Sequence, residues 1–166
     1  MKKPGRIGAG ALGAALGGAL SLSIQVVSYF EGTSLETYPD PVGIPTICTG
    51  HTGPTVALHQ TRSPEECTEL LKGDLGQAFD AINASLAPDI NQTLPPTRRA
   101  ALASFIFNVG EGAFQQSTLL KRLNAGQTRA ACDQLSRWVY ASGRKMSGLV
   151  KRREAERALC LIGIDS

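Results

Sequence analysis

The clearest hydrophobic pattern in the chain is an uncharged run near its beginning. Residues 7–27, read IGAGALGAALGGALSLSIQVV, contain no charged side chain, and five of these 21 residues are Gly and five are Ala. As a helix this run would span about 32 Å, which is enough for the hydrocarbon core of a bilayer. Small residues and the polar Ser21, Ser23 and Gln25 dilute its apolar character. The pattern therefore predicts a helix that can enter a membrane but is held there only weakly.

Three interpretations of this run are open. It is a cleaved signal peptide, a permanent anchor, or an anchor that later leaves the membrane. A basic start and small residues near its end suit a signal peptide. If the basic end stays in the cytoplasm, residues 28–166 face the periplasm.

The next stretch, residues 31–51, is rich in turn formers and reads EGTSLETYPDPVGIPTICTGH. Its Gly and Pro residues forbid a long helix and indicate tight turns around short strands. Glu31 would then end the preceding helix, and Asp40 and Thr46 would lie on a hairpin. Eight residues separate Glu31 from Asp40, and five separate Asp40 from Thr46. Taken alone, the two acids are as well explained by a helix end and a turn before proline.

These residue types suit glycoside hydrolysis. One carboxyl group protonates the leaving oxygen, and a second, ionised one activates or positions water, which a hydroxyl group can help to hold. To act as a general acid, Glu31 should be shielded from water, and the apolar segment before it could provide that shielding.

The rest of the chain is predominantly helical in its pattern. Ser63 and Glu66 form a capping box with proline at the first helical position. The single Trp, Trp138, is expected in the core because it lies between the apolar Leu135 and Val139. The expected helices span about 64–71, 75–87, 97–109, 119–124, 128–140 and 148–161, with a linker-like turn at 91–96 and a turn at 142–143.

Charge is divided between the two halves of the chain. The net charge of +3 is supplied by Lys2, Lys3 and Arg6. Residues 28–96 hold 9 acidic and 2 basic side chains, and residues 97–166 hold 5 acidic and 12 basic ones. This favours two lobes with a charged cleft, although ordinary solvated faces give the same counts. A basic lobe suits an anionic cell wall, and no nucleic-acid recognition motif is present.

The four cysteines have no metal-ligand spacing, so no metal site is expected. An even number in an exported chain favours disulfides. Three pairings are possible, and the favoured one joins Cys48 to Cys67 and Cys132 to Cys160, each within one lobe. The alternative is four thiols in a cytosolic protein.

The stretch at 31–51 resembles the active-site pattern of the phage-type lysozymes, the glycoside hydrolase family 24 endolysins of tailed phages. That pattern is Glu, eight residues, Asp or Cys, five residues and Thr, which Glu31, Asp40 and Thr46 match without gaps. A Gly-His pair follows in the family and is matched by Gly50 and His51. The resemblance covers about residues 28–166 and is carried further by Phe107-Asn108-Val109-Gly110, Ser117-Thr118-Leu119-Leu120, Leu123-Asn124-Ala125-Gly126 and Gly148-Leu149-Val150-Lys151-Arg152-Arg153.

The resemblance implies an α+β fold: a mostly helical, bilobal lysozyme with a small antiparallel sheet in its N-terminal lobe. It implies a small lobe at about 29–74, a bridging helix at about 75–90 and a helical lobe at about 91–166. The implied substrate is peptidoglycan, cut at the β-1,4 bond between N-acetylmuramic acid and N-acetylglucosamine by a monomer without cofactor. Glu31 would be the general acid, and Asp40 and Thr46 would hold the attacking water, with inversion at the anomeric carbon.

The resemblance also assigns secondary roles. Gly50, His51, Phe107 and Asn108 are expected to line the cleft, and His51 is expected to pair with Asp74. One basic residue of the last helix should approach Glu31, although the Lys151-Arg152-Arg153 run could equally be solvated.

The N-terminal run resembles that of the signal-anchor-release branch of this family, whose Gly/Ala-rich segment directs export, holds the enzyme inactive and then leaves the bilayer. The run ends within four residues of Glu31, which favours this interpretation. Residues 1–28 are then the signal-anchor-release segment and 29–166 the catalytic domain, exported by the host secretion machinery. The protein would face the periplasm from the inner membrane, anchored through residues 7–27, and then become soluble. The segment contains no cysteine, so activation would rest on refolding. The alternative is a non-catalytic, membrane-anchored wall-binding or pore-assisting lysis protein.

Overall fold

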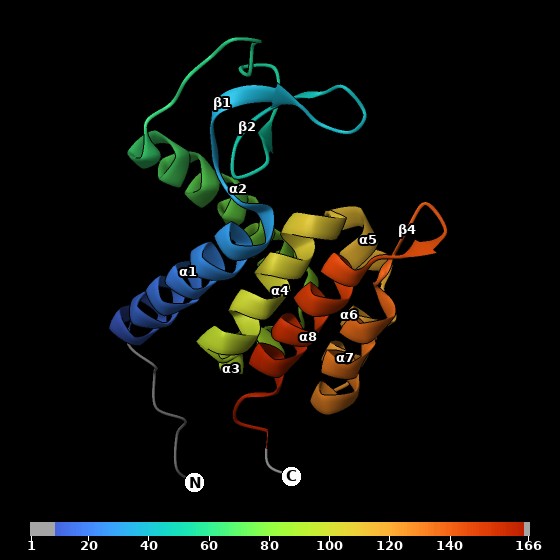
Figure 1. Ribbon diagram of the computed structural model, residues 1–166. Coiled ribbons are helices and arrows are strands. Elements are labelled where there is room, and N and C mark those ends of the chain that lie inside the picture. Colours follow the sequence, from blue (N-terminus) through green and yellow to red (C-terminus); the bar gives the residue numbers. More distant parts are fainter. Residues whose placement is uncertain (1–8, 165–166) are drawn as a thin grey trace, which may run out of the picture.

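The computed structural model describes the backbone of residues 9–164 and the side chains from residue 17 onward (Figure 1). The expected basic start at Lys2, Lys3 and Arg6 lies outside the described residues. A small lobe that carries a sheet stands above a larger helical lobe, and helix α2 (Pro64–Ser85) leads from one to the other. This confirms the predicted α+β class and the bilobal arrangement.

Helix α1 (Ala9–Glu31) packs along the helical lobe. Every fourth residue of its described C-terminal part is fully buried, namely Ala19, Ser23 and Val27. These small and medium side chains let α1 lie against α4, its most extensive contact. The helix passes without interruption through residue 28, where the sequence placed a boundary. Among helices of the described part of the chain, none combines the length and the apolar character needed to cross a membrane.

The small lobe is built on an antiparallel sheet in the order β1-β2-β3, with β1 at Ser34–Pro39, β2 at Pro45–Cys48 and β3 at His51–Thr52. Its core is small and consists of Ile47 with the disulfide between Cys48 and Cys67, which ties β2 to α2. Closing a loop of this size contributes about 3 kcal/mol on the chain-entropy model.

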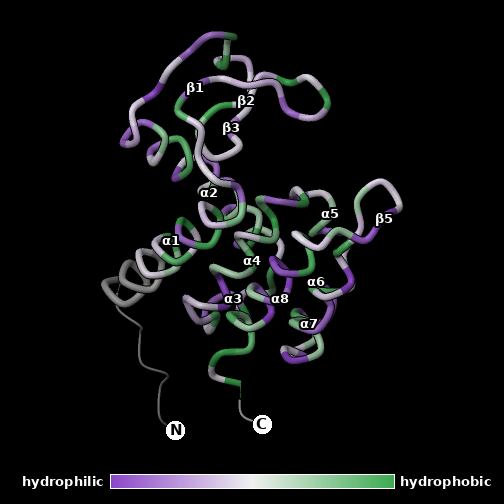
Figure 2. The backbone as a smooth tube through the Cα atoms, in the orientation of Figure 1, coloured by the Kyte–Doolittle hydropathy of each residue, from purple (hydrophilic) through white to green (hydrophobic). Residues whose placement is uncertain are grey.

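Helix α2 corrects the prediction of two helices at 64–71 and 75–87. It is a single helix of 22 residues that starts with the predicted capping box. Gly73 and Gly76 do not break it, because a continuous stripe of buried residues carries the helix past both glycines. Figure 2 shows hydrophobic and hydrophilic residues alternating along its turns. The stripe comprises Cys67, Leu71, Leu75, Ala78, Ala81 and Ile82.

The helical lobe surrounds α4 (Pro96–Val109), in which all nine residues from Arg98 to Ile106 are buried. The helix ends at Gly110, as predicted. Helices pack around it on several sides, and a disulfide joins Cys132 to Cys160, the second favoured pair. The surrounding elements are α3 (Pro88–Thr93), α5 (Glu111–Gln116), α6 (Thr118–Asn124), α7 (Thr128–Gln134), a 3-10 turn (Leu135–Arg137), β4 (Tyr140–Ala141), β5 (Arg144–Lys145) and α8 (Ser147–Leu161).

Three predicted boundaries in this lobe are wrong. The expected linker at 91–96 is partly helix α3, which starts at Pro88, a residue whose fixed φ suits a first helical turn. Helix α4 starts at Pro96, one residue before the expected start at 97, because proline suits the first helical turn. The helix expected at 128–140 stops at Gln134, continues as one 3-10 turn and gives way to β4.

Trp138 follows the 3-10 turn at Leu135–Arg137 and is partly buried, with its ring edge-on to Phe105 at a centroid distance of 5.2 Å. It belongs to the core, as predicted.

Candidate active site

Glu31 is the last residue of α1, and its position follows from how that helix ends. Gly32 adopts a positive φ of 69° and donates its N–H to the Ser28 carbonyl at 3.0 Å, which closes the last turn. The Glu31 side chain thus projects from a fixed helix end into a hollow of about 340 Å³ that Asn108, Met146 and Arg152 also line. It remains 28% exposed, so it is less shielded from water than the sequence suggested.

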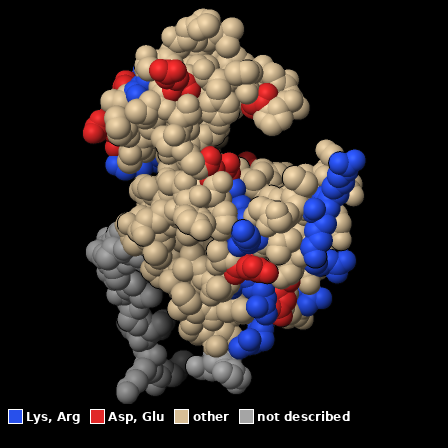
Figure 3. All heavy atoms as spheres, viewed as in Figure 1, with Lys and Arg blue, Asp and Glu red and all other residues tan. Residues whose placement is uncertain are grey.

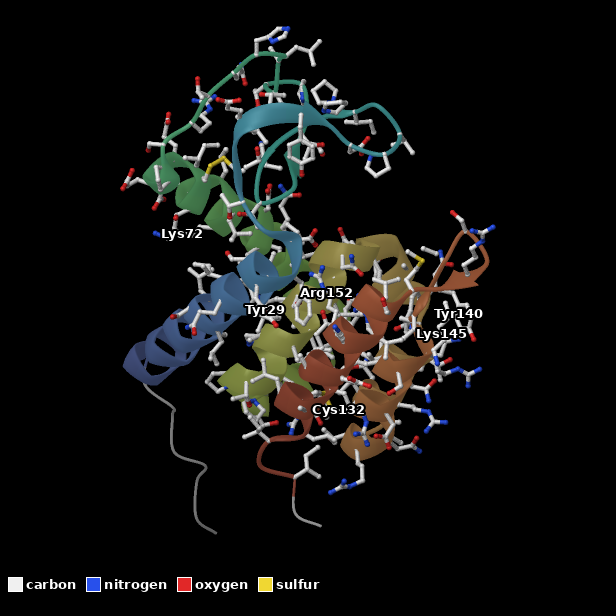
Figure 4. The ribbon with its side chains drawn as sticks, viewed as in Figure 1. Tyr29, Lys72, Cys132, Tyr140, Lys145 and Arg152 are labelled. Atoms are coloured by element: carbon white, nitrogen blue, oxygen red, sulfur yellow. A yellow bond between two sulfur atoms is a disulfide. The ribbon has the colours of Figure 1, made fainter. Side chains whose placement is uncertain are left out.

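Arg152 on α8 is the basic residue that approaches Glu31. Its Nη1 donates to Glu31 Oε1 at 2.5 Å, and its guanidinium lies 5.7 Å from the centre of the Phe30 ring. Figure 4 shows Arg152 beneath the C-terminal end of α1. Its side chain is only 4% exposed. The alternative of a solvated Lys151-Arg152-Arg153 run is therefore wrong for Arg152 and Arg153, both of which are buried, and holds only for Lys151.

A buried carboxylate, Glu156, holds Arg152 from behind. Glu156 is fully buried and accepts hydrogen bonds from Arg152 Nε at 3.1 Å, Arg153 Nη1 at 2.6 Å and Ser104 Oγ at 2.7 Å. Burial raises the pKa of the Glu156 carboxyl group, and the adjacent arginines only partly offset this. Burial likewise lowers the pKa of Arg153. One guanidinium, that of Arg152, is thus shared between Glu31 and Glu156.

The same network reaches Asn108 at the end of α4. Arg153 Nη2 donates to Asn108 Oδ1, and its guanidinium lies 5.0 Å from the centre of the Phe105 ring. Asn108 itself is exposed and lines the hollow that contains Glu31. Arg152 and Arg153 therefore orient Glu31 and Asn108, two residues that line the same hollow.

Asp40 is held by the turn between β1 and β2. Its Oδ1 accepts the backbone N–H groups of Val42 at 2.9 Å and Ile44 at 2.8 Å, a pattern that fixes the carboxylate to its own turn. Within the described residues, Oδ2 has no hydrogen-bond partner. One oxygen of Asp40 thus orients the group, and the other is left to accept a hydrogen bond.

Thr46 lies on β2 and is 3% exposed. Its hydroxyl donates to the Ile44 carbonyl at 3.0 Å. Because its proton is committed there, the Oγ1 lone pairs are left to accept a hydrogen bond. Asp40 and Thr46 therefore come from one hairpin and both offer an acceptor.

A second hollow, of about 380 Å³, brings together Gly50, His51, Phe107 and Asp74. Gly50 has a φ of 78°, and a Cβ there would come within 4.0 Å of the Phe107 ring, so this turn of the small lobe approaches α4 closely. His51 Nδ1 lies 2.8 Å from Asp74 Oδ2, which links β3 to α2. Neither of these two hollows includes Asp40 or Thr46.

Two members of the network were not predicted from sequence. Glu156 follows Arg152 by four residues and Arg153 by three, a spacing that allows helical ion pairs, but such spacing gives no sign of burial. Ser104 comes from a different helix, α4, and no local pattern links it to the site. Among the described residues, no three His, Cys, Asp or Glu side chains are grouped as metal ligands would be.

A carboxyl group at a helix end, open to a hollow and set between a sheet lobe and a helical lobe, is an arrangement typical of lysozymes. The sequence matches the family described as Phage lysozyme over residues 28–156, and the chain belongs to that family. It is accordingly a glycoside hydrolase of the muramidase type.

Known relatives and structures agree with this assignment. The chain is 42% identical over 153 residues to the SAR-endolysin of Enterobacteria phage PA-2, with 89% of this chain and 90% of that protein covered. A mutant of P22 lysozyme has a similar structure, with a TM-score of 0.76, 38% identity and coverage of 85% and 96%. The active form of the P1 phage endolysin shares the fold, with a TM-score of 0.78, 22% identity and coverage of 87% and 85%.

Proposed function

We propose that this enzyme hydrolyses the β-1,4 bond between N-acetylmuramic acid and N-acetylglucosamine in peptidoglycan and thereby lyses the bacterial host. The observation that carries the proposal is the Glu31 carboxyl group, fixed at a helix end, partly open to a hollow and contacted by the buried Arg152. A buried structural glutamate would show no such opening.

In this mechanism Glu31 protonates the leaving glycosidic oxygen. The water that attacks the anomeric carbon donates one hydrogen to Asp40 Oδ2 and one to Thr46 Oγ1, the two acceptors that the β1–β2 hairpin leaves open. Because a water stands between the carboxylate and the sugar, the product inverts its configuration. Gly50, His51, Phe107 and Asn108 are proposed to contact the sugar chain along the cleft.

Arg152 then has two roles in the proposal. It holds the Glu31 carboxyl group in place before reaction, and it stabilises the negative charge that Glu31 acquires when its proton leaves. Because Arg152 also contacts Glu156, its charge is not wholly committed to Glu31 before that step.

We also propose that residues 1–28 are a signal-anchor-release segment. The Gly- and Ala-rich run at 7–27, with the SAR-endolysin relative of phage PA-2, supports it. The host secretion machinery would place this run in the inner membrane with the enzyme facing the periplasm. With the run in the bilayer, Glu31 could not stay beside Arg152, and the enzyme would be inactive. On release the run would form α1 against α4, and the enzyme would act as a soluble monomer.

Replacing Glu31 with Gln tests the activity directly. The amide has the size of the acid but no transferable proton, so lysis should fall by about 10²-fold or more. The assay is turbidity clearing of permeabilised cells, with thermal unfolding as the control for folding. Folded Glu31→Gln protein that clears cells at the wild-type rate would exclude the proposed mechanism and favour a non-catalytic lysis protein.

A further inference from the structure

The hairpin formed by β4 and β5 has no part in the chemistry described so far. Ser142 and Gly143 connect its strands, with φ angles of 48° and 73°. Two successive positive φ values are typical of the type I′ turn, which closes hairpins tightly. The Met146 N–H donates to the Val139 carbonyl at 2.9 Å at the base of the hairpin, and Met146 is the residue before α8. The hairpin is therefore a short, fixed projection that leads directly into the helix bearing Arg152.

The pairing of the two strands separates its side chains onto two faces. Ala141 pairs with Arg144, and Tyr140 pairs with Lys145. Side chains of directly paired residues lie on the same face of a sheet, and neighbours along a strand lie on opposite faces. Ala141 lines the hollow that contains Glu31. Arg144 therefore shares the face directed to the active site, and Lys145 belongs to the opposite face.

Arg144 differs from the arginines that build the lobe. Arg98, Arg99, Arg152 and Arg153 are buried and donate hydrogen bonds to the protein. Arg144 is exposed, and within the described residues it has neither a hydrogen-bond nor an ion-pair partner. Figure 3 shows Lys and Arg gathered on the edge of the helical lobe beside the notch between the lobes, and Figure 4 places Tyr140 and Lys145 on the hairpin at this edge.

We propose that Arg144 is a substrate-binding residue that recognises a carboxylate of the peptide stem carried by N-acetylmuramic acid. This inference rests on the proposed function. The sugars of peptidoglycan are uncharged, and the acidic residues of the stem carry the negative charge. A guanidinium binds a carboxylate through two parallel hydrogen bonds, and an exposed, unpaired arginine beside the acid that cleaves the glycan is placed to receive one.

The experiment compares two single variants on two substrates. Arg144→Gln and Lys145→Gln remove the same charge from adjacent positions on opposite faces of one hairpin. The substrates are soluble peptidoglycan fragments and the same fragments after their stem carboxylates have been converted to carboxamides. The readouts are KM and kcat for reducing-end release at low and at physiological salt, with thermal unfolding of each variant.

We expect Arg144→Gln to raise KM for the native fragments about tenfold, the loss typical of one hydrogen bond to a charged group. Its KM on the amidated fragments should equal that of the wild type, and kcat should change little on either. Lys145→Gln should keep the wild-type ratio of the two KM values. Higher salt should narrow the difference in KM on native fragments between Arg144→Gln and the wild type, because salt screens the charge of Arg144.

Three outcomes would overturn the inference. Arg144→Gln could keep the wild-type KM on native fragments. Its KM could rise by the same factor on native and amidated fragments. Lys145→Gln could raise KM on native fragments as much as Arg144→Gln does. The last would show that only the general charge of the lobe matters. If the wild-type enzyme released reducing ends from neither substrate, the proposed function itself would fail.

Discussion

Glu31 and Glu156 are two carboxylates that contact the same arginine in opposite surroundings. Glu31 is 28% exposed in a hollow and Glu156 is 0% exposed, with Arg152 between them. Solvent and substrate can reach Glu31, whereas Glu156 meets only protein donors. In the proposed mechanism this difference in exposure suits Glu31 to the chemistry and Glu156 to the orientation of Arg152.

We therefore expect Glu156→Gln to destabilise the enzyme and to impair it. The change leaves the buried Arg153 without its counter-charge and Arg152 with Glu31 alone, and breaking a buried pair in this way costs about 3–5 kcal/mol. Glu154→Gln is the matched control, because Glu154 is exposed on the same helix and such surface changes cost less than about 0.5 kcal/mol. Urea unfolding of both variants tests this, and equal midpoints would contradict the role given to Glu156.

Asp40 and Thr46 make separable contributions in the proposed mechanism. Asp40→Asn removes the base and should lower kcat by about 10²–10⁴-fold. Thr46→Ala should cost less, because Asp40 still activates the water. The anomeric configuration of the first product, followed by NMR, should be inverted in the wild type. Retention would instead indicate that Asp40 attacks the sugar directly.

At the scale of single elements, α2 depends on its first turn. The Ser63 N–H donates to Glu66 Oε2 at 2.7 Å, the Glu66 N–H donates to Ser63 Oγ at 3.2 Å, and Arg62 donates to Glu66 Oε1 at 3.1 Å. The backbone hydrogen bond from Ser63, followed by that from Arg62, lowers the pKa of Glu66 in the folded protein. Helix α2 carries Asp74, Cys67 and the link between lobes, so its stability bears on the whole site.

The stabilisation from the Glu66 charge should therefore depend on pH. Since the pKa is lower in the folded state, the contribution is fully present above the unfolded value of about 4.3 and is lost as the pH falls through the folded value. Glu66→Gln keeps an acceptor for the Ser63 N–H but removes the charge. Its unfolding midpoint should thus lie below that of the wild type at pH 7, and the difference between the two midpoints should shrink as the pH falls below the unfolded pKa of about 4.3.

Ser63→Ala provides the comparison for this element. It removes an uncharged acceptor and should lower the free energy of unfolding by about 1 kcal/mol, with little dependence on pH. If the difference in unfolding midpoint between wild type and Glu66→Gln stayed constant from pH 3 to pH 7, the charge of Glu66 would contribute nothing to stability.

At the scale of the whole molecule, α1 has two proposed locations, the bilayer and the face of α4. Substitutions at Gly17 and Gly18 should change the balance between these two locations to different extents. A Cβ at Gly17 would meet nothing within 4 Å, whereas one at Gly18 would lie 3.7 Å from Pro96 Cβ. Leu at either position favours the bilayer by about 0.8 kcal/mol per added CH₂. At Gly18 the added Cβ would also be in ordinary van der Waals contact with α4, which favours the packed location and offsets part of that gain.

We expect both Gly17→Leu and Gly18→Leu to delay the appearance of soluble enzyme and the onset of lysis, with the longer delay for Gly17→Leu, which gains no contact with α4 from its Cβ. Membrane and periplasmic fractions taken at intervals after induction measure this. Gly17→Ser, which adds no apolar surface, should behave as the wild type. If both Leu variants reached the soluble fraction on the wild-type schedule, release would not control this enzyme.

The sequence by itself determined the class of the fold, the two disulfide pairs that it favoured and the local turns. The local features depend on short-range rules: the capping box of α2, the stop of α4 at Gly110 and the turn at Ser142-Gly143 all lie within a few residues of their cause. The class of the fold came instead from the resemblance to the phage-type lysozymes. The resemblance of residues 31–51 to the phage-type lysozymes singled out Glu31, Asp40 and Thr46 as a group, and their shared role in catalysis stays a prediction.

Only the tertiary structure decided which basic residue meets Glu31 and which acid supports it. Glu31 and Arg152 lie 121 positions apart, and Ser104 and Glu156 lie 52 apart. No local preference couples such residues, because their contact arises from the packing of α1, α4 and α8 on one another. The same packing buries Arg152 and Arg153 while Lys151 beside them stays exposed, a distinction that charge alone does not make. The continuity of α2 through two glycines was likewise settled by its buried stripe, since packing of an apolar face outweighs helix propensity.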